Sequence, residues 1–240
     1  MDFLDTFPSM EQQSLRDFKK FIDLSFRNFA RTYGDALESF FQPLLFFLVW
    51  LEKLLLSTPW PIIILVIAGL AWLGSRSWQL VLGSVVAFLF IGYFGMWKDT
   101  MATLAIITVA TLVCIAVGIP IGVLMARSNR TEKAILPILD AMQTIPSFVY
   151  LIPILMLLGI GKVPGLIAVC IYAIPPIVRL TNLGIREVDK ETLEASDAFG
   201  ATKLQKLTQV QIPLALPTIF AGVNQTIMMA LAMVVIASMI

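Results

Sequence analysis

The chain has 240 residues, of which 58% are hydrophobic and only 14% are charged, and its mean hydropathy is +0.88. A soluble domain of this length is less apolar, so we expect an all-α polytopic membrane protein built as a helical bundle. The net charge is +1 and histidine is absent, which excludes histidine-based metal sites and Ser-His-Asp catalysis.

The cysteines and the absence of nucleotide and metal motifs further restrict the functions that this chain can have. Cys114 and Cys170 lie inside apolar runs, where cysteine acts as a small hydrophobic side chain rather than as half of a disulfide. We find no Walker A motif, no GxGxxG and no cluster of metal ligands, so we expect no catalytic residue, no metal and no cofactor, and no ATP hydrolysis by this chain alone. Residues 1–35 lack the compact apolar core and cleavage site of a signal peptide.

Residues 10–33 have the periodicity of an amphipathic helix, which we expect Gly34 to end. A helix with one apolar and one basic face is suited to lie on anionic lipid, and packing on a partner or on the rest of the chain is the alternative. The apolar face holds Leu15, Phe18, Ile22, Phe26, Phe29 and Tyr33, and the basic face holds Arg16, Lys20, Arg27 and Arg31.

The next apolar run, Phe40–Leu56, carries Glu52 and Lys53 near its end. A transmembrane helix needs about 20 apolar residues. Because the uncharged part of this run is shorter, we interpret it as interfacial or obliquely embedded.

Clearer spans follow along the chain. Tryptophans flank the first two, as they do at membrane interfaces. The last span reaches the end of the sequence without a polar stop, which predicts that C-terminal spans are missing. The predicted spans are Pro59–Leu73, Trp78–Trp97, Met101–Ala126, Ile135–Leu158, Val163–Val178 and Leu214–Ile240.

Lysine and arginine near the ends of the spans predict the orientation. One loop carries Arg127, Arg130 and Lys133, and two spans later another carries Arg179, Arg186, Lys190, Lys203 and Lys206. Both loops lie on the same side, with Arg76, and we expect that side to be cytoplasmic. If Phe40–Leu56 does not cross, the N-terminus lies on the extracytoplasmic side. The five basic residues between Arg16 and Arg31 weigh against that placement.

Polar and helix-bending residues lie within the predicted spans. Asp140 is a candidate for lining a pathway or for pairing with Arg179 or Arg127, and a position near the interface lowers the cost of its charge. Asn224 and Gln225 are more simply interpreted as interhelical hydrogen-bond partners. Gly118 and Gly122 permit close helix approach, and Pro146, Pro153, Pro175 and Pro176 are expected to bend or break their spans.

Glu191–Pro217 is the longest polar interruption in the second half of the chain. It predicts two short helices, with Gly200 ending the first and Thr202 capping the second. Pro213 and Pro217 lead back into apolar sequence. A solvated hairpin between two spans, with small side chains and a few charges, is suited to docking a soluble partner.

This hairpin resembles the EAA loop of binding-protein-dependent ABC importer permeases. That pattern is Glu-Ala-Ala, three residues, Gly, nine residues, Ile, one residue, Leu-Pro. The chain has Glu194-Ala195-Ser196, Gly200 and Val210-Gln211-Ile212-Pro213 at the same spacing. The resemblance implies a coupling helix that sits in a groove of an ATPase subunit, formed by Glu194, Ala195, Ser196, Ala198, Phe199 and Gly200.

Longer runs, at 140–165, 172–185, 194–201 and 213–240, resemble the permeases of glycine betaine/proline betaine importers, the ProW type. The resemblance implies a multi-pass permease of the bacterial inner membrane, acting as a homodimer with two cytoplasmic ATPase subunits that bind ATP and Mg²⁺. It also implies an extracytoplasmic binding protein that selects a quaternary ammonium osmolyte. Candidate pathway or gate residues are Asp140, Thr144, Tyr150, Asn224 and Gln225.

The expected organisation is an N-terminal interfacial segment (1–38), peripheral membrane helices (39–99) and a core transmembrane domain (100–240) that contains the coupling hairpin (187–213). A channel or secondary transporter for small cations or osmolytes is the first alternative, but it needs an ion site at the midplane, and Asp140 is the only acidic candidate within the predicted spans between Met101 and Val178. A membrane-embedded enzyme is the second, and it lacks a histidine base.

Overall fold

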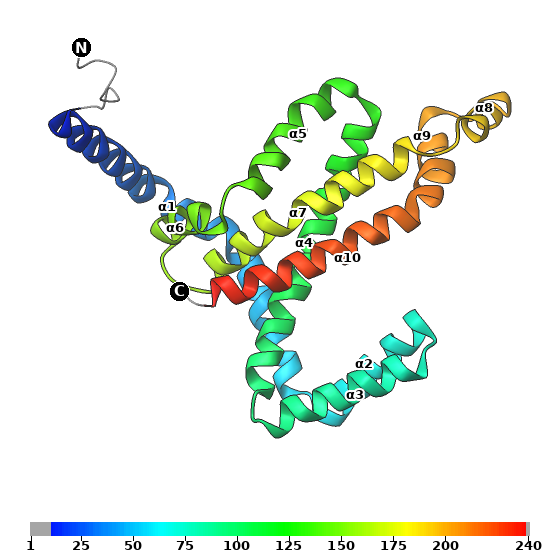
Figure 1. Ribbon diagram of the computed structural model, residues 1–240, viewed down its shortest axis with the longest axis horizontal. Coiled ribbons are helices and arrows are strands. Elements are labelled where there is room, and N and C mark those ends of the chain that lie inside the picture. Colours follow the sequence, from blue (N-terminus) through cyan, green and yellow to red (C-terminus); the bar gives the residue numbers. More distant parts are fainter. Residues whose placement is uncertain (1–10, 239–240) are drawn as a thin grey trace, which may run out of the picture.

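The computed structural model describes residues 11–238, which are helical and contain no strand. Figure 1 shows three long helices, α4, α7 and α10, crossing side by side, with the other elements arranged around them. The elements are α1 (Gln12–Ser57), α2 (Trp60–Ser75), α3 (Trp78–Tyr93), α4 (Trp97–Arg127), α5 (Asn129–Thr144), α6 (Ser147–Leu158), α7 (Lys162–Arg186), α8 (Lys190–Ala198), α9 (Lys203–Gln205), the π-helical segment η1 (Lys206–Gln211) and α10 (Ile212–Ala237). The expected all-α membrane architecture is confirmed.

Glycines bring α4, α7 and α10 into close contact. A methyl group at Gly122 of α4 would lie 2.6 Å from Cβ of Thr181 on α7, and one at Gly222 of α10 would lie 3.1 Å from Cβ of Leu180. Both glycines are buried. In lipid, helices associate mainly through van der Waals packing, which small residues allow by letting the backbones approach closely. The contacts of these glycines therefore define the core.

The contacts also fix the helix directions. Along α4 and α7, Cys114 lies beside Cys170 and Gly122 beside Thr181, so the two helices run the same way. On α10, Gly222 lies against Leu180 whereas Thr218 lies against Gly184, so α10 runs the opposite way. The ends at Arg127, Arg186 and Lys203 therefore lie together, as the charge pattern predicts, and we name this the basic end of the bundle.

The two cysteines are free, and Cys114 is buried. The Cys114 thiol donates to the Cys170 carbonyl oxygen, with a sulfur–oxygen distance of 3.6 Å. They pack as small side chains between α4 and α7, which confirms the sequence interpretation.

The prediction that Gly34 ends the N-terminal helix is wrong, because α1 continues through it to Ser57. The division placed at residue 38 therefore falls inside one helix. A methyl group at Gly34 would lie 3.3 Å from the Leu157 carbonyl oxygen at the end of α6. Glycine is needed here for close approach, since it adopts no left-handed conformation in α1.

The second half of α1, Ala36–Ser57, is long and apolar enough to cross a membrane. This corrects the interpretation of Phe40–Leu56 as too short. Glu52 forms an ion pair with Lys162 at the start of α7, which reduces the cost of a charge within an apolar helix. The half of α1 before Ala36 lies beside α6 rather than beside the hairpin that follows α7 (Figure 1).

The helices α2 and α3 form a hairpin that projects from the bundle (Figure 1). Each has 16 residues, about 24 Å of helix, which is less than the about 30 Å of a hydrocarbon core. The second predicted span, Trp78–Trp97, is therefore too long: α3 ends at Tyr93 and Trp97 begins α4. The tryptophans at the ends of α2 and α3 are therefore typical of membrane interfaces, but they do not show that these helices cross the membrane.

The predicted span Ile135–Leu158 is not one straight helix. It divides into α5 and α6, whose axes differ by 93°. The break falls at Ile145 and Pro146, because a residue before proline favours extended backbone and Ile145 has ψ 128°. In contrast, Pro153, Pro175 and Pro176 lie inside continuous helices, so only the break expected at Pro146 is found.

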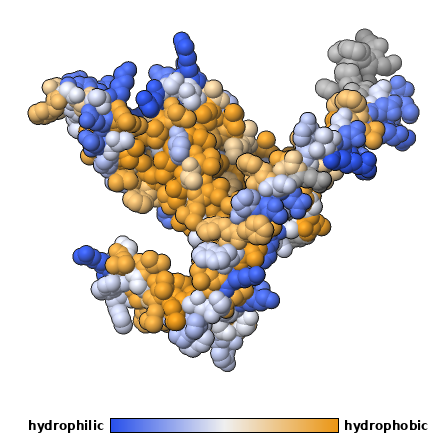
Figure 2. Space-filling model, turned by 180° about the vertical axis from the view of Figure 1, so that it is seen from behind, coloured by the Kyte–Doolittle hydropathy of each residue, from blue (hydrophilic) through white to orange (hydrophobic). Residues whose placement is uncertain are grey.

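Figure 2 shows a broad hydrophobic surface over the bundle, with hydrophilic side chains gathered at the hairpin that follows α7. Large apolar side chains face outward on α10, where Phe220 is 64% exposed and Met228 is 62% exposed. An apolar belt with polar ends is the surface that a bilayer requires.

Candidate functional site

The hairpin between α7 and α10 has the turn that its sequence predicts. Asp189 caps α8 by accepting a hydrogen bond from the Glu191 amide at 3.1 Å. Gly200 follows α8 with φ +75°, a left-handed conformation that favours glycine. Thr202 and Gln205 then form a capping box at the start of α9, which satisfies the free amides of the new helix.

An ion pair between Lys206 and Asp197 joins the two arms of the hairpin. The caps fix the backbone of each arm, and the ion pair fixes one arm against the other. The hairpin is therefore a preformed element rather than a flexible loop.

The predicted coupling residues lie on the surface of this hairpin. Glu194, Ala195, Ala198 and Gly200 are exposed, whereas Ser196 is half-buried and donates to the Leu193 carbonyl oxygen at 2.7 Å. The aromatic ring of Phe199 is 92% exposed. A rigid hairpin that presents an apolar ring beside small side chains has the chemistry of a protein-docking surface.

The second arm of the hairpin does not end before the last span. Residues from Lys203 onward continue through η1 into α10, so Lys203–Ala237 forms one helical rod of 35 residues. Pro213 lies in the first turn of α10 and Pro217 lies inside it, where neither stops the helix. The second arm of the hairpin is therefore continuous with α10.

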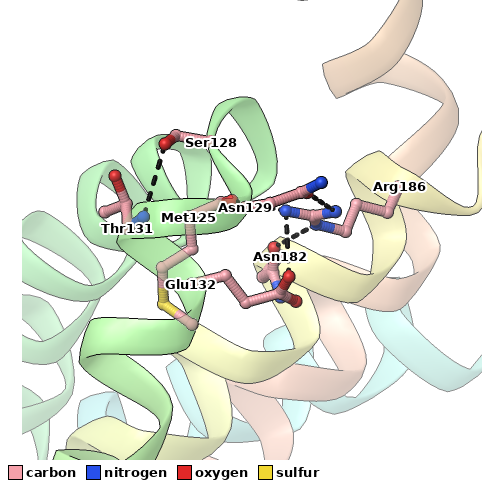
Figure 3. Close-up of polar contacts among 7 residues, drawn as sticks. All are labelled: Met125, Ser128, Asn129, Thr131, Glu132, Asn182 and Arg186. Atoms are coloured by element: carbon pink, nitrogen blue, oxygen red, sulfur yellow. Dashed lines mark hydrogen bonds and ion pairs between the residues drawn. The ribbon is translucent and has the colours of Figure 1, made fainter.

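A polar cluster that sequence reasoning missed lies at the basic end, between α4, α5 and α7 (Figure 3). The Arg186 guanidinium donates to the Met125 carbonyl oxygen at 2.8 Å and to the side-chain oxygens of Asn129 at 2.8 Å and Asn182 at 2.9 Å, and it pairs with Glu132 at 3.0 Å. Asn182 also donates to Glu132 at 2.8 Å. One arginine thus holds the α4–α5 turn against α7, one short turn before the hairpin.

The only sequence signal for this cluster is the spacing of Asn182 and Arg186, four residues apart on one helix face. Glu132 lies 50 residues from Asn182 along the chain, so no local pattern connects them.

Replacing Arg186 with methionine should destabilise the protein substantially. Each hydrogen bond to a charged group contributes about 1.5–3 kcal/mol, and the change leaves Glu132 without its countercharge and the side-chain oxygen of the buried Asn182 without its donor. We expect a clear fall in the Tm of the purified protein in detergent. Arg130→Met removes an exposed cation and should change stability by about 0.5 kcal/mol or less, so equal Tm values for the two variants would contradict the bracing role.

Asp140 and Arg179 form an ion pair between α5 and α7 at 2.5 Å, as the sequence allowed. Asp140 remains largely exposed. Thr144, also exposed, donates its hydroxyl to the Asp140 backbone carbonyl oxygen at 2.9 Å. Together with the Arg186 cluster, the pair attaches the polar face of α5 to α7.

The other candidate gate residues do not form one site. Tyr150 is half-buried, and its hydroxyl has no hydrogen-bond partner within residues 11–238. Asn224 and Gln225 lie exposed on α10. Within residues 11–238 neither side chain forms a hydrogen bond to another helix, so their role as interhelical hydrogen-bond partners stays a prediction.

These features define a helical membrane protein with a capped, exposed hairpin at the basic end. The part of the chain that the structure describes holds no group of three or more residues suited to bind a metal. Sequence comparison assigns the class more closely. Residues 118–240 match the family described as binding-protein-dependent transport system inner membrane component.

Three relatives illustrate the match. The glycine betaine/proline betaine transport system permease protein ProW of Escherichia coli is 53% identical over 79% of this chain and 53% of its own length. The glycine betaine/carnitine transport permease protein GbuB of Listeria monocytogenes is 49% identical over 77% and 66%. The glycine betaine transport system permease protein OpuAB of Bacillus subtilis is 38% identical over 99% and 82%.

The chain belongs to the family of binding-protein-dependent transport system inner membrane components. It is therefore a multi-pass protein of the inner membrane, as predicted, and its relatives are permease subunits rather than ATPases. The chain spans about half the length of ProW, its relative in Escherichia coli.

Proposed function

We propose that this chain is the permease subunit of an ATP-driven importer, and that the hairpin from Lys190 to Gln205 couples it to an ATPase subunit. The observation that carries the proposal is the rigid hairpin at the basic end, exposed at Phe199 and continuous with α10. ATP and Mg²⁺ bind to the partner subunit, and this chain performs no catalysis.

The hairpin has two mechanical outputs. One is α10, which continues the second arm through η1. The other is α7, which ends at Arg186 and carries α5 with it through the Asp140–Arg179 pair and the Arg186 cluster. Motion of an ATPase against α8 thus moves two core helices and the broken α5–α6 segment, which is suited to open and close a route.

The partners follow from the family resemblance. We propose a homodimer of permeases, two ATPase subunits at the cytoplasmic side and a substrate-binding protein at the opposite side. The positive-inside bias supports placing the basic end in the cytoplasm. The exposed face of α10 that bears Asn224 and Gln225 is open to a second copy or to the route.

The proposed cargo is glycine betaine or a related quaternary ammonium osmolyte. The names of the three relatives include glycine betaine, proline betaine and carnitine, which share a methylated cationic nitrogen and a carboxylate. The test is uptake of labelled glycine betaine into proteoliposomes. It should require the intact permease, the ATPase, the binding protein and ATP together, and uptake driven by an ion gradient without ATP would favour a secondary transporter instead.

The structure gives little support to the alternative of an ion-coupled secondary transporter, which the sequence left open. It requires an acidic residue that can bind and release an ion at the midplane. Asp140 is paired with Arg179, so its charge is already compensated.

We expect the permease to have no high-affinity cargo site of its own. Tyr150, Asn224 and Gln225 supply neither an aromatic cage nor a countercharge, and a route must release its cargo quickly. Calorimetric titration of purified permease with glycine betaine and with choline should show no saturable binding at micromolar concentrations. Micromolar binding that Asn224→Ala or Tyr150→Ala abolishes would place a specific site inside the membrane domain.

The N-terminal half of α1 is expected to lie on anionic lipid. Its apolar face is open, with Phe18, Ile22 and Tyr33 each about half exposed. Attraction to an anionic surface contributes about 1 kcal/mol per basic residue. Reversing the charges of Arg16, Lys20, Arg27 and Arg31 should weaken the dependence of transport on anionic lipid, whereas exchanging arginine and lysine at these positions should preserve it. An unchanged lipid dependence after reversal would assign the helix a structural role.

A further inference from the structure

A pocket of about 350 Å³ lies between the end of α4 and the second arm of the hairpin. Three of its seven lining residues are cations, Arg127, Lys203 and Lys206, and Gln211 adds an amide. The remaining wall is apolar and includes the buried side chains Ile185 and Leu207. Sites of this composition orient a ligand by a few polar groups against a fixed wall.

The charge of this pocket is only partly compensated within the chain. Lys206 pairs with Asp197. Within residues 11–238, no ion pair or hydrogen bond is found for the side chains of Arg127 and Lys203. Two unpaired cations facing one cavity repel each other, so an anion between them would be stabilised by both.

The position of Arg127 is fixed rather than accidental. It is the last residue of α4, and the neighbouring Met125 carbonyl accepts a hydrogen bond from Arg186 at 2.8 Å. Lys203 begins α9 directly after the Thr202 capping box. Both backbones are thus held, and a ligand needs to order only the side-chain ends.

Both cations also stand at the ends of helices long enough to cross the membrane, Trp97–Arg127 and Lys203–Ala237. At about 1.5 Å per residue these helices exceed the about 30 Å of a hydrocarbon core, so the pocket lies outside that core, where lipid headgroups and soluble anions can both reach it. Phosphate is the anionic group found at this level, and arginine binds it through two parallel hydrogen bonds while lysine binds it as a point charge.

We propose that this pocket binds a phosphate group, held between Arg127 and Lys203 and supplied by an anionic lipid headgroup or by a soluble phosphate. Such a ligand bridges the end of α4 to the coupling hairpin. It restrains the movement between them, so its presence should tune the response of the bundle to the hairpin.

The test measures binding to the intact purified permease alone, so its outcome is independent of the proposed transport function. Native mass spectrometry compares retention of phosphatidylglycerol and phosphatidylcholine by wild type, by Arg127→Gln/Lys203→Gln and by Arg130→Gln/Lys133→Gln. The last variant removes two exposed cations of the same end of the bundle that do not line the pocket. We expect the pocket variant to bind phosphatidylglycerol about 100-fold more weakly, because it loses two direct charge-assisted contacts to the phosphate, and the control variant, which loses none, to bind within about tenfold of wild type.

A second arm titrates inorganic phosphate and follows Tm. Phosphate stabilisation that the pocket variant loses, without selective lipid retention, would identify a soluble source for the same site. The exchange Arg127→Lys/Lys203→Arg keeps the charge and should preserve binding, which guards against a general folding defect. Equal losses in the pocket and control variants would overturn the proposal, as would a pocket variant that binds both probes normally. Loss of ATPase binding by the pocket variant with unchanged phosphate and lipid binding would assign the cations to the protein partner instead.

Discussion

Gly200→Val should abolish most ATP-coupled transport while leaving the protein folded in the membrane. Gly200 has φ +75°, and a β-branched residue is strongly disfavoured there. A left-handed conformation costs an ordinary residue about 1–2 kcal/mol, which is a shift of about 5- to 30-fold against the bent hairpin. Uptake into proteoliposomes and transport-dependent ATP hydrolysis should both fall by about this factor or more.

The open surroundings of Gly200 allow the effect of backbone strain to be separated from the effect of a steric clash. No atom lies within 4 Å of a Cβ placed there, so the substitution introduces strain but no clash. Gly200→Asn should keep near-normal transport, because asparagine tolerates the left-handed conformation. Gly83→Val on α3 places the same side chain in open space without a positive φ and should also be mild. Normal transport by Gly200→Val would contradict the coupling role of the hairpin.

Gly122→Ala should damage the bundle itself. The added Cβ would lie 2.6 Å from Cβ of Thr181 and 2.7 Å from the Val178 carbonyl oxygen. Because the Val178 contact is backbone, no side-chain rotation relieves it, and α4 and α7 have to separate. Overpacking of this kind costs about 1–3 kcal/mol or more. We expect a marked fall in Tm and in the yield of protein from the membrane.

The matched control is Gly69→Ala on α2, where nothing lies within 4 Å of the new methyl group. Alanine favours helix over glycine by about 1 kcal/mol, so this variant should be as stable as wild type or slightly more so. If Gly122→Ala were equally stable, the close packing of α4 on α7 would not support the bundle as described.

Local chemistry explains what the sequence predicts correctly. The left-handed turn at Gly200 and the cap at Thr202 depend on residues within one turn of each other. The apolar runs of α4, α7 and α10 are long enough to be recognised without tertiary information. Gly118 and Gly122 stand one helical turn apart, so their spacing predicts a shared face for close helix approach, and the structure identifies α7 as the helix that packs there.

The sequence predictions fail where contacts between residues distant in the chain determine the structure. A glycine within a helix costs only about 1 kcal/mol, and at Gly34 the approach of α6 favours a continuous helix over a stop. Pro146 and Pro153 are equally plausible as breaks, but only the first ends a helix. The Arg186 cluster joins residues of α7 to residues 50 to 61 positions earlier in the chain, which no periodic pattern detects.

The proposed coupling role of the hairpin requires contact with an ATPase subunit, and photo-cross-linking measures that contact. The permease carries p-benzoyl-phenylalanine in place of Phe199, which is 92% exposed on the hairpin, or in place of Tyr93, which is 86% exposed at the end of α3. We expect irradiation of the assembled complex to link position 199, and not position 93, to the ATPase subunit. Cross-links from position 93 alone, or from neither position in a complex that hydrolyses ATP, would contradict the assignment of the hairpin.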